Sequence, residues 1–259
     1  MTRVLSALVL LPIVVGVVWF LPPIATLVLA CVASVLAFAE YAALARALDA
    51  HIPRVLCGAA VMSACVAVTV PGTASLVMMA LLVLLGGLAV AHGQPGPSVL
   101  VDTAASVLPV VYIGVPLGAL AASRAIAGRE ALLLLMAVIV ISDSAQYYTG
   151  RAFGRRPLAP SISPGKTKEG AIGGVLFGTA AMAIGGRYVL EAPVLNSTIV
   201  GFGVVVVGII GDLFESLLKR SAGVKDSSNL IPGHGGVLDR IDSWLFAAPV
   251  YYVFLLRLR

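Results

Sequence analysis

Apolar runs that approach 20 residues recur along this sequence, and they constrain its fold more than any other feature. A run of that length is what a helix needs to cross about 30 Å of hydrocarbon. The alternating apolar and polar pattern of outer-membrane barrels is absent from the sequence. Only 11% of the residues are charged, whereas a soluble domain has roughly 25%. The sequence therefore predicts an all-α fold, a polytopic integral membrane helix bundle.

The apolar runs and the turn residues between them predict about nine transmembrane helices. We expect them at 4–20, 23–44, 54–71, 74–91, 104–122, 131–149, 171–190, 194–218 and 241–257. Two long polar connections, 150–170 and 219–240, interrupt the pattern. We divide the chain into 1–130, expected to serve packing, lipid contact or dimerisation, and 131–259, expected to be the catalytic transmembrane region.

Lys and Arg residues are distributed unevenly between the two sides that these helices define. Twelve of the seventeen fall on the side that carries both long polar connections. Because cytoplasmic loops are enriched in Lys and Arg, we expect both connections to face the cytoplasm. We expect the bilayer to be the inner membrane of a bacterial cell, with the active site facing the cytoplasm.

Carboxylates gather in the second half of the chain, where three segments bring them to one level of the membrane. Asp143 and Asp212 lie near the inner ends of their predicted helices, and Asp239 and Asp242 lie at the start of the last one. Ionisable groups are costly at such depth and by default indicate function. Grouped carboxylates suit Mg²⁺, although helix capping or pairing with nearby arginines would also explain each of them.

Spacing adds detail to this cluster. Asp212, either Glu215 or Ser216, and Lys219 fall on one face of a helix. Asp239 and Asp242 share a face if their helix begins early. Lys219 lies where its helix emerges from the membrane, so we expect a surface lysine whose loss costs under about 0.5 kcal/mol of stability.

Two loops have compositions that suit phosphate. The glycines around His234, in "GHGG", offer backbone N–H groups to an anion, although a flexible turn explains them equally well. The basic loop that contains "SPGKTKEG" leads into a helix start, where charge and the helix dipole both favour phosphate, although a positive-inside loop without a ligand would also explain it. After it, Gly170, Gly174 and Gly178 form a small-residue face that is typical of close helix packing.

The stretch "SLLKRSAGVKDSSNLIPGHGGVLDRIDS", from Ser216 to Ser243, resembles the signature of the phosphatidate cytidylyltransferases. The stretch "SDSAQYYTGRAFGRRPLAPSISPGKTKEGAIGG" is similar to the second typical block of that family, with Lys168 where an aromatic residue is often found. The resemblance covers roughly 140–245. The first half of the chain resembles the family only in its hydropathy and its number of spans.

The resemblance implies an enzyme that reacts CTP with phosphatidic acid to give CDP-diacylglycerol and pyrophosphate. It implies Mg²⁺ as the cofactor, with a second metal ion as a further expectation, and a homodimer in the bilayer. We expect no nucleic-acid partner. Catalytic roles are assigned to Lys219, Arg220, His234, Asp239 and Arg240. Substrate binding is assigned to Asp143, Lys166, Ser216, Lys225, Asp226, Gly235 and Gly236. The metal is assigned to Asp212, Asp239 and Asp242.

Other functions stay open on the sequence alone. One is a related lipid cytidylyltransferase or a polyprenol-type kinase, which would differ in the lipid accepted. Another is an ion-coupled transporter, which predicts internal repeats and charges near the membrane midplane. A third is a structural scaffold, which has no use for clustered carboxylates. The sequence contains no repeat, and its charges lie at one face, so the enzyme is favoured.

Overall fold

The computed structural model describes residues 2–92, 95–96, 98–231, 233 and 235–258. Its helices are α1 (Thr2–Phe20), α2 (Pro23–Ala47), α3 (Arg54–Thr69), α4 (Ala74–His92), α5 (Ser98–Pro109), the π-helix η1 (Val110–Gly114), α6 (Val115–Phe153), α7 (Lys168–Val189), α8 (Val194–Ser221) and α9 (Leu238–Arg257). Its strands, β1 (Pro157–Ala159) and β2 (Ser163–Thr167), form a small antiparallel hairpin.

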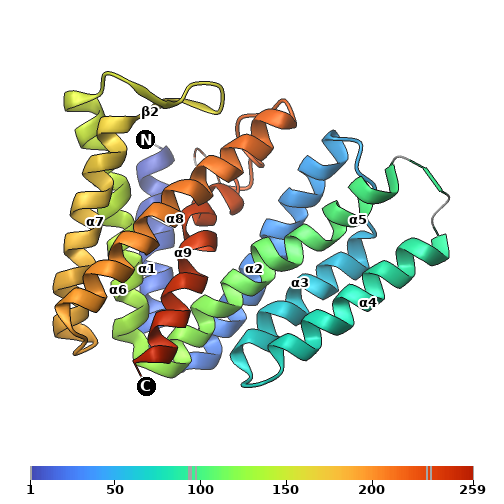
Figure 1. Cartoon of the computed structure of the whole chain (residues 1–259), viewed down its shortest axis with the longest axis horizontal. Coiled ribbons are helices and arrows are strands. Elements are labelled where there is room, and N and C mark those ends of the chain that lie inside the picture. The colour runs from blue at the N-terminus through green and yellow to red at the C-terminus, as the bar shows by residue number, and fades with distance from the viewer. Residues whose placement is uncertain (1, 93–94, 97, 232, 234, 259) are drawn as a thin grey trace.

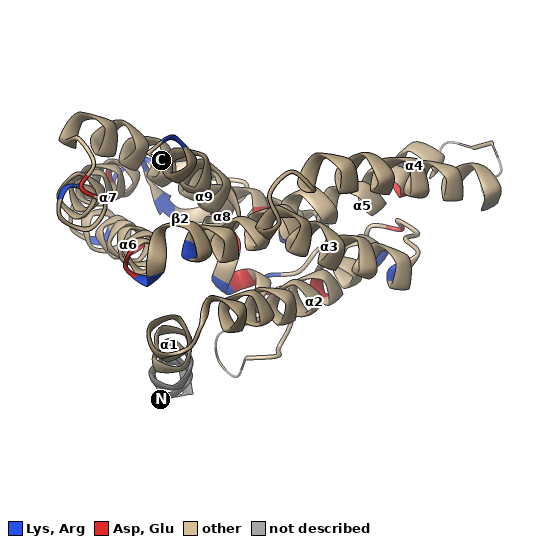
Figure 2. Ribbon diagram, turned by 90° about the horizontal axis from the view of Figure 1, so that it is seen from below, with Lys and Arg blue, Asp and Glu red and all other residues tan. Residues whose placement is uncertain are grey.

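The expected all-α membrane architecture is confirmed. Within the described part of the chain, five helical segments are long and apolar enough to cross a bilayer: Pro23–Ala47, Ala74–Ala91, Ser98–Phe153, Lys168–Val189 and Val194–Ser221. Two shorter apolar helices, Leu11–Phe20 and Arg54–Thr69, accompany them. Figure 2 shows how few charged residues these helices carry.

The helices expected at 104–122 and 131–149 belong to one continuous helical segment, Ser98–Phe153, with a sharp kink. A straight helix of its 56 residues would be about 84 Å long, far more than one bilayer. Gly128 interrupts it with a φ of 89° and a ψ of 175°, a backbone conformation that glycine adopts without steric cost. The two parts of this helical segment run in different directions in Figure 1.

Small residues set the spacing between α6 and α7, as the sequence predicted. A Cβ atom on Gly174 would lie 2.3 Å from Cγ of Gln146, and one on Gly170 would lie 2.7 Å from the Gln146 carbonyl oxygen. A Cβ on Gly178 would lie 3.0 Å from Cβ of Ser142 on α6 and 2.6 Å from a methyl group of Val205 on α8. The glycine face of α7 therefore lets it pack directly on the backbone of α6.

The segments that carry most of the predicted site residues lie together at one end of the bundle. The β1–β2 hairpin, the C-terminal ends of α6 and α8, and the N-terminal end of α9 all lie at the top in Figure 1. Beneath them, the ring of Tyr112 from η1 packs edge-on against Phe214 and Phe246, with centroid distances of 5.1 and 6.1 Å. These aromatic rings join α8, α9 and η1 directly below the charged end.

Candidate active site

Three carboxylates from three helices meet at this end of the bundle. Asp143 of α6, Asp212 of α8 and Asp242 of α9 lie close enough to interact electrostatically. Lys166 of β2 forms an ion pair with Asp212 and also acts on the charges of Asp143 and Asp242. The structure thus brings together four of the predicted site residues from segments as far apart in sequence as α6 and α9.

Two local features place these side chains. A Cβ atom on Gly211 would lie 2.6 Å from the carbonyl oxygen of Asp242, so the glycine lets α8 and α9 touch where Asp212 and Asp242 begin. On the other side, Oγ1 of Thr167 accepts the N–H of Gly170 at 3.1 Å and caps the start of α7. This cap fixes the end of β2, the strand that carries Lys166.

Lys219 lies between two buried carboxylates. Its ammonium group forms ion pairs with Glu215, one turn earlier on α8, and with Asp239 of α9. The side chains of Lys219, Glu215 and Asp239 are 12%, 0% and 4% exposed. The expectation of a surface lysine is therefore wrong, because the packing of α9 against the end of α8 covers it. The predicted helix face is present, since Ser216 Oγ lies 3.5 Å from Asp212 Oδ1.

Asp239 is surrounded by protein donors. Its Oδ2 accepts the N–H of Ser227 at 2.9 Å, the hydroxyl of Ser227 at 2.8 Å and the N–H of Gly236 at 2.7 Å. Its Oδ1 accepts from Lys219. Burial alone would raise the pKa of Asp239, but these hydrogen bonds outweigh it and lower that pKa to about 2. Metal binding by Asp239 stays a prediction, and it would compete with Lys219 for Oδ1.

The glycines of the signature fit closely around Asp239. Gly235 has a φ of 78°, and a Cβ atom there would lie 2.5 Å from Asp239 Oδ2. The N–H of Gly236 does approach an anion, and in this structure the anion is the Asp239 carboxylate. His234 lies outside the described residues.

The remaining predicted residues line the exposed rim of this end. Arg220, Lys225, Asp226 and Arg240 are all exposed. Arg220 reaches across to the hairpin, where its Nε lies 3.5 Å from the carbonyl oxygen of Ile162. Three of these residues are cationic, and exposed cationic groups attract anions from solution.

The sequence interpretation missed one residue that joins this site. Glu40 of α2 is 5% exposed and hydrogen-bonds to the signature segment, including the hydroxyl groups of Ser227 and Ser228. A signal was present, because Glu40 is a lone acid within the apolar run predicted at 23–44, and such residues by default indicate function.

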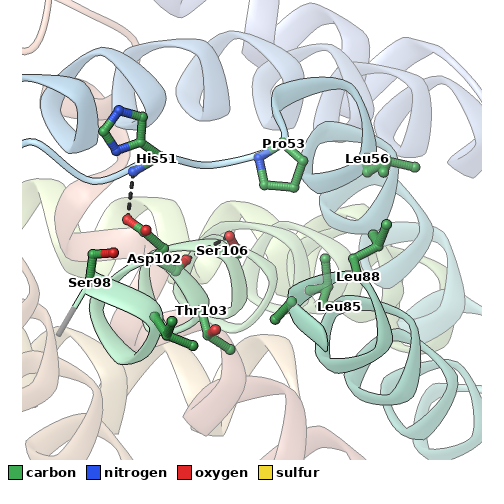
Figure 3. A pocket seen from close by; sticks show the side chains of 11 residues that line it. His51, Pro53, Leu56, Leu85, Leu88, Ser98, Asp102, Thr103 and Ser106 are labelled. Atoms are coloured by element: carbon green, nitrogen blue, oxygen red, sulfur yellow. Dashed lines mark hydrogen bonds between the residues drawn. The ribbon is translucent and has the colours of Figure 1, made fainter. Parts of the chain in front are cut away.

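A separate cavity of about 610 Å³ lies among α3, α4 and α5, and none of the predicted site residues lines it. Its lining combines leucines, such as Leu85 and Leu88, with polar groups near the connection between α2 and α3. There the N–H of His51 donates to Asp102 Oδ1 at 2.7 Å (Figure 3). The polar contacts of the candidate site belong to another part of the molecule.

Comparison with known proteins agrees with the resemblance found in the sequence. The model of the cytidylyltransferase family matches residues 1–258. The phosphatidate cytidylyltransferase of Aquifex aeolicus is 46% identical over 124 residues, which cover 48% of this chain and 46% of that protein. That of Haemophilus influenzae is 47% identical over 132 residues, covering 49% and 46%.

A plant protein extends the comparison. The chloroplastic phosphatidate cytidylyltransferase 5 of Arabidopsis thaliana is 45% identical over 130 residues, covering 49% of this chain and 32% of that protein. The chain spans about half the length of the curated relatives it matches. Since the family model matches almost every residue, the chain belongs to the cytidylyltransferase family.

Proposed function

We propose that this protein transfers the cytidylyl group of CTP to phosphatidic acid and so forms CDP-diacylglycerol and pyrophosphate. The observation that carries the proposal is the joining of Asp143, Lys166, Asp212 and Asp242 at one end of an apolar helix bundle. Such an end can admit a soluble nucleotide from one side and a lipid head group from the other. The relatives named phosphatidate cytidylyltransferase support this substrate pair.

The reaction needs little covalent help from the protein. A phosphate oxygen of phosphatidic acid attacks the α-phosphorus of CTP, a new P–O bond forms, and the bond to the β-phosphate breaks with its electron pair leaving on pyrophosphate. The phosphate monoester is an adequate nucleophile at neutral pH, so no Ser, Cys or His base is required. The obstacle is repulsion between two anions, and positioned cations remove it.

We assign the cations by their position. Lys166 reaches the carboxylate cluster from β2, and Lys219 lies deeper, between Glu215 and Asp239. Arg220, Lys225 and Arg240 lie at the exposed rim, where they would meet the β- and γ-phosphates. Ser216, Asp226, Gly235 and Gly236 would complete the substrate contacts, and His234 would orient the phosphates.

The carboxylates fit Mg²⁺. Among the residues that the structure describes, no three His, Cys, Asp or Glu side chains already form a metal-binding group, and Asp212 is paired with Lys166. However, Mg²⁺ typically takes one or two carboxylates and completes its shell with waters and substrate phosphates. We propose Asp212 and Asp242 as its ligands, with Asp143 next to them. Bound there, the ion would neutralise charge that develops on the transferring phosphoryl group.

We further propose nine membrane passes, because Gly128 divides α6 into two parts. The positive-inside rule favours a cytoplasmic location for the hairpin and for the connection between α8 and α9. We also propose that the membrane is a bacterial inner membrane, and that the protein forms a homodimer, as the family resemblance implies. A single Cys at exposed position 160 tests the orientation. An impermeant thiol reagent added to sealed, right-side-out cells should leave it unmodified, and ready labelling would reverse the assignment.

One assay tests the reaction. Purified protein in phosphatidic acid vesicles with CTP and Mg²⁺ should release pyrophosphate and form CDP-diacylglycerol in equal amounts. Activity only with another phospholipid or a polyprenol would favour the related lipid enzymes. A transporter or a scaffold would release no pyrophosphate with any lipid.

A further inference from the structure

Glu40 of α2 has a carboxylate that is enclosed by hydrogen-bond donors from 187 to 198 residues further along the chain. Its Oε1 accepts the hydroxyl of Ser228 at 2.7 Å and the N–H of Val237 at 2.9 Å. Its Oε2 accepts the N–H of Leu238 at 2.8 Å and lies 2.9 Å from the hydroxyl oxygen of Ser227. No other residue of α2 has such a set of contacts among those described.

Two of these donors belong to the first turn of α9. The first N–H groups of a helix have no partner within the helix, and the N-cap residue of α9, Val237, provides no side-chain acceptor. Glu40 replaces that acceptor with a negative charge, which the positive end of the helix dipole also stabilises. The first residues of α9 are therefore held against α2.

The other two donors connect Glu40 to the active site. Ser227 Oγ lies 2.9 Å from Glu40 Oε2 and 2.8 Å from Asp239 Oδ2. A hydroxyl group has one proton, so Ser227 donates to one of the two carboxylates at a time and couples them. Asp239 in turn binds Lys219. A continuous polar chain thus runs from α2 to the lysine at the centre of the site.

The close fit of this contact explains a glycine in the signature. A Cβ atom on Gly236 would lie 2.3 Å from Glu40 Oε2 and 2.1 Å from Ser227 Oγ. No other residue type could therefore occupy position 236 while Glu40 and Ser227 keep these places. Gly236 also donates its N–H to Asp239, so the same glycine closes the network from the other side.

We infer that Glu40 is a positioning residue for the transfer reaction, which holds Ser227, Ser228 and the start of α9 so that Asp239 and Lys219 face the substrates. The inference rests on the proposed cytidylyl transfer. It gives region 1–130, for which the sequence predicted packing, lipid contact or dimerisation, a direct part in building the active site. Glu40 acts through Ser227 and Asp239 and does not itself contact substrate.

The variant Glu40→Gln tests this with almost no change in shape. Each carboxylate oxygen of Glu40 faces one backbone N–H group and one serine hydroxyl group. In either orientation the new NH₂ group therefore opposes the N–H of Val237 or of Leu238, and the serine hydroxyl beside it must turn to accept. We expect kcat per folded molecule to fall roughly ten- to hundred-fold, the range caused by small misplacements of reacting groups. KM for phosphatidic acid should stay within about two-fold, because the rim residues are unchanged. Backbone hydrogen exchange at Val237 and Leu238 should become faster.

Glu130→Gln is the matched control. Glu130 is also a glutamate of a long helix, but its side chain is 51% exposed and it pairs only with Arg129 among the described residues. Both kcat and exchange at Val237 should equal those of the unmodified protein. The assay uses full-length protein in vesicles of phosphatidic acid with CTP and Mg²⁺, and melting curves give the folded fraction.

The outcomes are distinct. Normal kcat per folded Glu40→Gln molecule would overturn the inference, even if the variant melts earlier, because a purely structural role changes only the folded fraction. If Glu40→Gln does not fold, Ser228→Ala decides: it removes one donor to Glu40, and a normal kcat there would equally overturn the inference. If the unmodified protein forms no CDP-diacylglycerol, the proposed function fails, while hydrogen exchange still reports whether Glu40 holds the start of α9.

Discussion

Lys166 of β2 and Asp212 of α8, 46 residues apart in sequence, form an ion pair at the end of the bundle where three carboxylates meet. Their side chains are 23% and 27% exposed, so both remain accessible to a ligand from solution. In the proposed reaction both residues would change partners when CTP and Mg²⁺ bind. Lys166 would turn to a phosphate of CTP, and Asp212 would then be free to bind the metal ion.

Lys166→Ala should raise KM for CTP about ten-fold or more, the loss expected for one charge-assisted hydrogen bond. Stability should change by less than about 1 kcal/mol, because the ion pair is partly exposed to solvent. Lys168→Ala, at an exposed position two residues later, is the control and should match the unmodified protein. CTP titrations and melting curves on the same preparations measure both effects. An unchanged KM would remove Lys166 from nucleotide binding.

Lys219→Ala should lower the free energy of unfolding by about 3–5 kcal/mol, because it leaves the buried carboxylates of Glu215 and Asp239 without a cation. Adding Glu215→Gln to the same protein should restore part of this loss by removing one of the two charges. Denaturation curves of the single and double variants provide the comparison. Equal stability of Lys219→Ala and the unmodified protein would show that the lysine is not buried as described.

Asp239→Asn and Asp242→Asn should differ from each other. Asp239 pairs with Lys219, so its loss should reduce stability by roughly 3–5 kcal/mol. Asp242 lies among other carboxylates, so its replacement should leave stability unchanged or raise it, while turnover is lost or requires much more Mg²⁺. Melting temperature and Mg²⁺-titrated activity separate the two. The same behaviour in both variants would contradict the different partners of these residues.

Gly211→Ala should abolish most activity, since its Cβ atom would lie 2.6 Å from the Asp242 carbonyl oxygen and would push α9 away from α8. Gly203→Ala on the same helix is the control, because a Cβ atom there would lie 3.9 Å from Val250, an ordinary contact. That variant should keep full activity and gain up to about 1 kcal/mol of stability from its better helix propensity. Equal activity of the two variants would show that the site does not depend on the close approach of α8 and α9.

The bounds of most helices could be predicted closely, because they depend on apolar runs and turn residues that are contiguous in the sequence. The predicted helix 194–218 corresponds to Val194–Ser221, and 23–44 corresponds to Pro23–Ala47. The break in the 104–149 region was predicted as well, but its form was not: Gly128 reverses the direction of a helix that continues on both sides. A short hairpin before α7 was not predicted, because its strands are stabilised mainly by each other and by the start of that helix.

The sequence by itself determined that this is an apolar helical protein, that its acidic and basic groups gather in the second half, and which family it resembles. These properties follow from the composition, from the length and spacing of the apolar runs, and from a contiguous motif. Only the tertiary structure decided which charges meet: Lys166 with Asp212, Lys219 with both Glu215 and Asp239, and Glu40 with the start of α9. Such pairings depend on how closely separate helices approach one another. That distance is set by packing at residues such as Gly211 and Gly236, and no local pattern along the chain records it.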